Sequence, residues 1–182
     1  EHYTDPDELL RDADSAMYRA KESDEIVVVF DTEMREKLAK RLNLETALRT
    51  ALDEEQFLLH FQSIVSLSDG TVEGYEALAR WQHPERGLLH PIDFIEVMEE
   101  TGLIVPLGHW VIAHACREMM RRFAGQRPVD MPYVSVNLSG KHLSQEDLVP
   151  SIEAALADTG FHPTLLGLDL TESAIIANLP RA

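Results

Sequence analysis

The sequence predicts an α/β fold in which parallel strands alternate with helices and carry polar side chains near their carboxyl ends. From about residue 53 onward, strand-like segments are separated by segments with helical spacing. Three of the strand-like segments, "EALAR", "VSVNLS" and "LGLDLTE", carry a carboxylate or an amide. The stretch from 53 to 182 is about half the length of a full (β/α)8 barrel of roughly 250 residues. The pattern therefore fits either the first half of such a barrel or an open two-layer α/β sheet.

Charge and cysteine content narrow the class of function. The 182 residues include 16 basic and 32 acidic side chains, a net charge of −16, which argues against binding a nucleic acid polymer. An anionic substrate would need a local arginine or a bound cation. Cys116 is the single cysteine, so no internal disulfide can form, and its place on the apolar stripe of a helix argues against a nucleophile.

A reduced cytoplasmic setting fits this composition best. The start, "EHYTDPDELL", is acidic and unlike a signal peptide, and no segment reaches the roughly 18 apolar residues of a membrane span. A tether to the inner membrane would have to come from domains outside this sequence.

The first 52 residues divide into two segments. In residues 1–31, Asp5 and Pro6 predict the start of a helix, and "IVVVF" predicts a buried strand. One helix and one strand cannot form a core, so this segment is expected to be the end of another domain. Residues 32–52 lack glycine and proline and carry leucines at near-helical spacing, which predicts a linking helix, broken near Asn43.

The remaining segment, 53–182, gives the alternating elements in order. "QFLLHFQSIVSL" and "TVEGYEALARW" predict two strands of a hairpin joined by "SDG". Helices are expected over 90–102, ending at Gly102, over about 107–123, and over a segment with Ser144 as N-cap and Gly160 beyond its end. "MPYVSVNLS" and "TLLGLDLTES" complete the predicted strands.

Oxygen-bearing side chains lie near three of the predicted strand ends. Glu76, Asn137 and Asp169 would converge there, because parallel α/β folds gather the carboxyl ends of their strands at one rim. Such ligands suit Mg²⁺, Mn²⁺ or Ca²⁺. On the strand of Glu76, Leu78 and Arg80 share its face, so Arg80 could bind a phosphate oxygen above an apolar floor.

Structural alternatives exist for each of these residues taken singly. Glu76 and Arg80 could form a surface ion pair, Asn137 could shape a turn, and Asp169 could cap a helix. The spacing alone leaves these alternatives open.

Longer motifs resemble one known family. "GYEALARW", "HPERGLLHPIDFIEVMEETGLIVPLGHWVI", "VSVNLS" and "LDLTES" are similar, in this order, to the EAL family of cyclic di-GMP phosphodiesterases, over about residues 53–180. "DADSAMYRAKE" followed by "VVVFD" resembles the end of a GGDEF diguanylate cyclase domain. The resemblance implies a GGDEF–EAL tandem with a GGDEF remnant at 1–31, a linking helix at 32–52 and the N-terminal part of a TIM-type EAL barrel at 53–182.

The resemblance also implies an activity and roles for individual residues. The expected reaction is metal-dependent hydrolysis of cyclic di-GMP to linear pGpG in bacterial signalling, with Mg²⁺ or Mn²⁺ as cofactor and Ca²⁺ as an inhibitory substitute. Metal ligands would be Glu76, Asn137 and Asp169, and catalytic residues Glu76 and Glu172, the latter ordering a loop beside the metal. The residues expected to contact substrate are Gln62, near a guanine, together with Leu78 and Arg80.

Departures from the family keep alternatives open. Ser63 stands where the family usually has proline, Asp169 where it usually has glutamate, and the remaining metal ligands of the family lie beyond Ala182. The 182 residues alone are therefore expected to be inactive. A cyclic di-GMP receptor without turnover and an interaction-only module are the alternative functions. An upstream sensory or GGDEF domain and a homodimer are the further partners that the resemblance implies.

Overall fold

The computed structural model describes residue 17 and residues 32–170, except for the side chains of 32–35. The predicted GGDEF remnant at 1–31 and the predicted catalytic Glu172 therefore lie outside the described residues, apart from Met17. The chain divides into two compact units, Glu1–Ala47 and Leu48–Ala182. The second unit contains every candidate site residue that is described.

Helix α2 spans Thr32–Asp53 and matches the predicted linking helix. The predicted break near Asn43 is wrong, because the helix continues through this residue. Asparagine costs at most about 0.7 kcal/mol in a helix interior, and no glycine or proline adds to that cost. Towards the end of α2, the side chains of Leu48 and Ala51 are completely buried.

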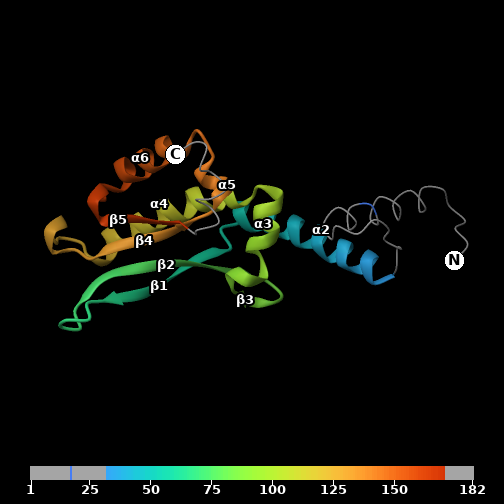
Figure 1. Cartoon of the computed structure of the whole chain (residues 1–182), viewed down its shortest axis with the longest axis horizontal. Helices are drawn as coiled ribbons and strands as arrows, with labels where there is room; N and C mark the ends of the chain where they lie inside the picture. Colours follow the sequence, from blue (N-terminus) through green and yellow to red (C-terminus); the bar gives the residue numbers. More distant parts are fainter. Residues whose placement is uncertain (1–16, 18–31, 171–182) are drawn as a thin grey trace, which may run out of the picture. The chain divides into compact units, whose positions relative to one another are not determined.

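The second unit is built on a mixed sheet whose strands follow the order β1-β2-β4-β5, with β3 paired to β2 (Figure 1). Strands β2, β4 and β5 are parallel to one another, as predicted, whereas β1 and β3 run antiparallel to β2. The predicted hairpin is present as β1 and β2, with Gly70 in its turn at a φ of 74°. Short β3 was not predicted. The strands are β1 Phe57–Val65, β2 Val72–His83, β3 Gly87–Leu89, β4 Tyr133–Leu138 and β5 Leu166–Leu170.

The helices follow the predicted order with two corrections. The segment 90–102 is a 3-10 turn followed by a short α-helix, and it ends at Gly102 as expected. Ser144 does not cap the later helix, since it ends α5 instead, and α6 begins after Asp147. The α-helices are α3 Ile95–Thr101, α4 Ile104–Arg122, α5 Gly140–Leu143 and α6 Leu148–Thr159, and the 3-10 helices are η1 Pro91–Asp93, η2 Pro128–Asp130 and η3 Pro163–Leu165.

Helix α4 contacts β1, β2 and β4, and α6 packs against α4 (Figure 1). Aromatic side chains fill the junction between α4 and the hairpin, where Phe57 lies 5.7 Å from Phe94 and 6.2 Å from Trp110 between ring centroids. Trp81 is completely buried and stacks on Phe57 at 6.0 Å. This aromatic layer packs against the face of β2 that is directed toward α4, so polar residues of β2 lie on the opposite face.

Among the described residues, no helix combines the length and apolar character that crossing a membrane requires.

Candidate functional site

Strand register places the predicted site residues on one face of the sheet. Directly paired residues and residues two apart on one strand share a face. Gln62 pairs with Glu76, Glu76 pairs with Ser135, and Asn137 pairs with Asp169. The opposite face holds Phe57 and Trp81, which belong to the aromatic layer beside α4. Four strands therefore contribute polar side chains to one surface, hereafter the site face.

Glu76 and Asn137 are in direct contact although they are 61 positions apart in the sequence. The Asn137 amide nitrogen donates a hydrogen bond of 2.6 Å to Glu76 Oε1. With the amide nitrogen turned to the carboxylate, the carbonyl oxygen of Asn137 remains as an acceptor. The pair thus presents a carboxylate and a carbonyl oxygen side by side.

Asp169 joins this pair through the sheet. It is the register partner of Asn137 on the parallel strand β5, and its side chain is exposed. The structure therefore brings together the three residues that the sequence predicted to converge. Glu172, the third acidic residue of the prediction, lies outside the described residues.

Leu78 and Arg80 continue the site face along β2. Arg80 donates a hydrogen bond of 2.7 Å from Nη1 to the backbone oxygen of Ala79. Its Nε is buried and has no hydrogen-bond partner among the described residues. A buried guanidinium nitrogen without a partner is costly, so an anion that accepted its hydrogen bond would be favoured.

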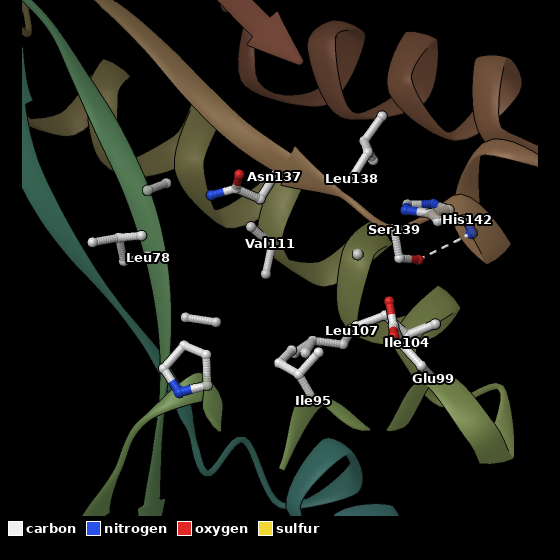
Figure 2. Close-up of a pocket in the computed structure, with 14 residues that line it drawn as sticks. Leu78, Ile95, Glu99, Ile104, Leu107, Val111, Asn137, Leu138, Ser139 and His142 are labelled. Atoms are coloured by element: carbon white, nitrogen blue, oxygen red, sulfur yellow. Dashed lines mark hydrogen bonds between the residues drawn. The ribbon is translucent and has the colours of Figure 1, made fainter. Parts of the chain in front are cut away.

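A cavity of about 350 Å³ opens beside Leu78 and Asn137, between β2 and β4 (Figure 2). The two strands pair only from Gly74–Ala77 to Tyr133–Val136, and the cavity borders the unpaired residues that follow. Leu78 and Asn137 line its near end, as Figure 2 shows, and Leu107 and Val111 of α4 lie behind. Most of the lining is aliphatic, with polar groups from Asn137, Ser139, His142 and Glu99.

The far end of the cavity was not predicted from the sequence. His142 is buried, with 1% of its surface exposed, and its Nε2 has no hydrogen-bond partner among the described residues. Burial, together with the nearby His109 ring at 4.7 Å, lowers the pKa of His142 to about 4. Gly108 makes this packing possible, because a Cβ at this position would collide with the His142 ring. The helical spacing of apolar residues in "GHWVIAHAC" is the one sequence signal that could have predicted a buried helix face beside His142.

Cys116 is buried, as its place on an apolar helix stripe predicted, and two further histidines make structural contacts. Burial raises the pKa of Cys116 to about 11, so the thiol is protonated at neutral pH and unsuited to nucleophilic attack. Burial also lowers the pKa of His114, whose ring stacks on Trp110 at 4.1 Å. His83 accepts hydrogen bonds from the backbone of Glu85 and Arg86.

The oxygen donors of the site face fit a hard divalent cation only in part. Within the described residues, no three histidine, cysteine, aspartate or glutamate side chains cluster closely enough to hold a metal. The set at hand is instead two carboxylates and one amide oxygen, Glu76, Asp169 and Asn137. Mg²⁺ prefers oxygen ligands and usually keeps several waters or substrate oxygens, so an incomplete protein set of this composition suits it.

The comparisons assign the family. Residues 45–182 match the EAL domain family. The chain belongs to this family, and the "EALAR" strand with the Glu76–Asn137 contact lies inside the matched segment.

Named relatives give the family a chemical context. The cyclic di-GMP phosphodiesterase PdeR of Escherichia coli is 38% identical over 179 residues, which are 98% of this chain and 26% of PdeR. The bifunctional diguanylate cyclase/cyclic di-GMP phosphodiesterase MucR of Pseudomonas aeruginosa is 39% identical over 91% of this chain and 24% of MucR. This chain thus spans about a quarter of the length of either relative.

Solved structures show the same fold. The MucR phosphodiesterase in complex with cyclic di-GMP has a TM-score of 0.70 and 38% identity, covering 76% of this chain and 55% of that one. The Xanthomonas citri FimX EAL domain, also in complex with cyclic di-GMP, has a TM-score of 0.69 and 26% identity over 80% of this chain and 55% of the FimX chain.

Proposed function

We propose that this chain is part of a metal-dependent phosphodiesterase that hydrolyses cyclic di-GMP to linear pGpG. The observation that carries the proposal is the Glu76–Asn137 contact on the site face, with Asp169 in register beside it. The relatives named as cyclic di-GMP phosphodiesterases and the EAL domains in complex with this dinucleotide support the choice of substrate.

The layout of the site face supports a set of proposed substrate contacts. The unpartnered Nε of Arg80 suits a phosphate oxygen, and Leu78 offers an apolar surface beside it. Gln62, which pairs with Glu76 on the site face, would hydrogen-bond a guanine. The cavity behind Leu78 is large enough to accept one base of the dinucleotide, with aliphatic walls for the ring faces.

The oxygen ligands of the site face would bind the metal at which the phosphodiester is hydrolysed. Glu76, Asp169 and the carbonyl oxygen of Asn137 would hold Mg²⁺ or Mn²⁺, with Ca²⁺ as a substitute that inhibits. A bound divalent cation lowers the pKa of its water and offsets phosphate charge. In the reaction, a water oxygen bonds to phosphorus as one ribose 3′-oxygen leaves, which opens the ring. Glu172 is proposed to order the adjoining loop.

Replacing Glu76 tests the proposal. In the full-length protein, Glu76→Ala should reduce Mn²⁺- or Mg²⁺-dependent turnover of cyclic di-GMP by more than the roughly 10–100-fold that losing a metal's outer hydrogen-bond partner costs. Glu73→Ala is the matched control, because Glu73 is an exposed carboxylate on the same strand, outside its regular pairing with β1 and without a proposed role in the site. Chromatographic detection of pGpG measures both variants. Equal turnover in the two would remove Glu76 from the metal site.

A receptor role is the second candidate, favoured by Asp169. Aspartate is one methylene shorter than the glutamate that the family resemblance leads us to expect there, so one ligand could fall short of the metal. A receptor would bind cyclic di-GMP with the same site face and leave it intact. Titration of the full-length protein with ligand, with and without Mn²⁺, separates the roles, since pGpG formed on adding Mn²⁺ excludes binding without turnover.

The larger context remains a set of proposals. We infer a TIM-type barrel of which the described strands form part, preceded by a GGDEF domain through the helix at 32–52. An upstream sensory input, a homodimer and a cytoplasmic location, with a membrane tether as a variant, also stay predictions. The expected inactivity of the 182 residues alone stays a prediction as well.

A further inference from the structure

His60 lies on the site face in the edge strand β1, and neither the motifs nor the metal geometry assigns it a role. On β1 it lies two residues before Gln62, and across the hairpin it pairs directly with Leu78. The neighbouring pairs are Gln62 with Glu76 on one side and Leu58 with Arg80 on the other. His60 is therefore flanked on its own and its partner strand by the residues proposed to contact substrate.

The His60 side chain points away from the helical layer. The alternate residues Phe57 and Phe61 of β1 face α4, where Phe57 packs against Trp110 and Phe61 lies under the guanidinium of Arg122 at 5.0 Å. His60 is exposed, so its imidazole is not needed for the packing of the described core. An exposed histidine between two proposed ligand contacts is available to bind the same molecule.

We propose that His60 donates a hydrogen bond to a ribose 2′-hydroxyl of the bound dinucleotide, an assignment that rests on the proposed function. In a nucleotide, the ribose lies between the base and the phosphate. His60 lies about 7 Å along the strand from Gln62, the proposed base contact, and about 7–8 Å diagonally from Arg80, the proposed phosphate contact. A neutral imidazole keeps one N–H donor and a charged one has two, so the contact does not depend on the protonation state.

Discrimination between ribose and deoxyribose tests the assignment. The probe is cyclic di-GMP compared with its 2′-deoxy analogue, and the readout is kcat and KM for each with the full-length protein. Wild type should prefer the ribose form by about tenfold in kcat/KM, the value of one hydrogen bond of about 1.4 kcal/mol. His60→Ala should raise KM for cyclic di-GMP about tenfold, leave kcat nearly unchanged and abolish the preference.

Two further variants sharpen the experiment. His60→Asn keeps a donor of similar reach and should retain part of the preference. Ser63→Ala is the matched control, because Ser63 is exposed on the same strand and faces the opposite side. Thermal unfolding of each variant checks that the fold is retained, and the preference of the wild-type protein provides a test that needs no substitution.

The outcomes separate the two proposals. Wild type that hydrolyses both nucleotides equally well, or His60→Ala that keeps the ribose preference, would overturn the role of His60 alone. Wild type that neither hydrolyses nor binds cyclic di-GMP would overturn the proposed function and His60's role with it. If wild type binds without turnover, the same comparison is made on Kd, and loss of the ribose preference in His60→Ala supports the contact.

Discussion

The two faces of the sheet use alternate residues of the same strands for opposite purposes. On the face toward α4, β2 and β4 contribute Ala77, Trp81, Val134 and Val136, all of which are buried. On the site face, the intervening positions of these strands carry Glu76, Leu78, Arg80, Ser135 and Asn137, of which only Ser135 is buried.

The difference separates stability from chemistry. Burial of large apolar side chains stabilises the sheet against α4, so the polar residues of the site face can be chosen for ligand contacts. The separation depends on strand alternation, since a slip of one residue in register would bury Glu76 and expose Trp81. Substitutions on the two faces should accordingly fail in different assays.

The largest effect is expected on the helical face. Trp81→Ala removes a completely buried side chain and the hydrogen bond of 3.0 Å from its indole nitrogen to Gln56. The free energy of unfolding should fall by roughly 3–5 kcal/mol. Chemical denaturation of the full-length protein measures the loss.

Arg80→Ala, one residue earlier on the other face, is the matched comparison. Its free energy of unfolding should change by less than that of Trp81→Ala, because Arg80 is only partly buried and its Nε makes no hydrogen bond within the described residues, while cyclic di-GMP turnover falls. A variant pair in which Arg80→Ala destabilises as much as Trp81→Ala would contradict the division between the faces.

Alternation is also what made much of the fold predictable from sequence. Strands β1 and β2, their turn and Gly102 as a helix end follow from local patterns. The contact of Glu76 with Asn137 was also expected, although Glu76 does not lie at the end of β2 as predicted: it lies within the strand, and only the pairing of β2 with β4 ends beside it. These features depend on residue spacing and on the general rule that parallel strands end at one rim.

Other features depend on tertiary packing that spacing does not reveal. The cavity behind Leu78 and the burial of His142 against Gly108 arise only once α4 and α5 pack together. The predicted helix break near Asn43 failed for a local reason, because the weak turn preference of asparagine was outweighed by the surrounding helix-forming residues.

His142 is a buried polar residue on the helical side of the sheet, and its protonation should make the stability of the protein depend on pH. Its pKa near 4 lies below the ordinary 6.5, so the unfolded chain takes up the proton first as pH falls. Stability should be fully present above about 6.5, decrease by up to about 1.4 kcal/mol per pH unit towards 4, and level off below.

Thermal unfolding between pH 7 and 4 measures this slope. His142→Asn should flatten it, whereas His162→Gln, at an exposed histidine, should leave it in place. An unchanged slope in His142→Asn would show that other groups govern the acid sensitivity.

The smallest effect is expected at Asp169, where the family resemblance leads us to expect glutamate. Asp169→Glu extends the carboxylate by one methylene on the strand beside Asn137. If the shorter side chain holds its oxygen too far from the cation, kcat of the full-length protein should rise several-fold, because small misplacements of a ligand lower the rate. Stability should stay unchanged, as the side chain is exposed. Asp169→Asn, which removes the charge at constant length, should lower kcat instead. A fall of kcat in both variants would contradict the idea that Asp169 is too short. It would mean that the site face requires aspartate at this position, as strictly as the face toward α4 requires its buried apolar residues.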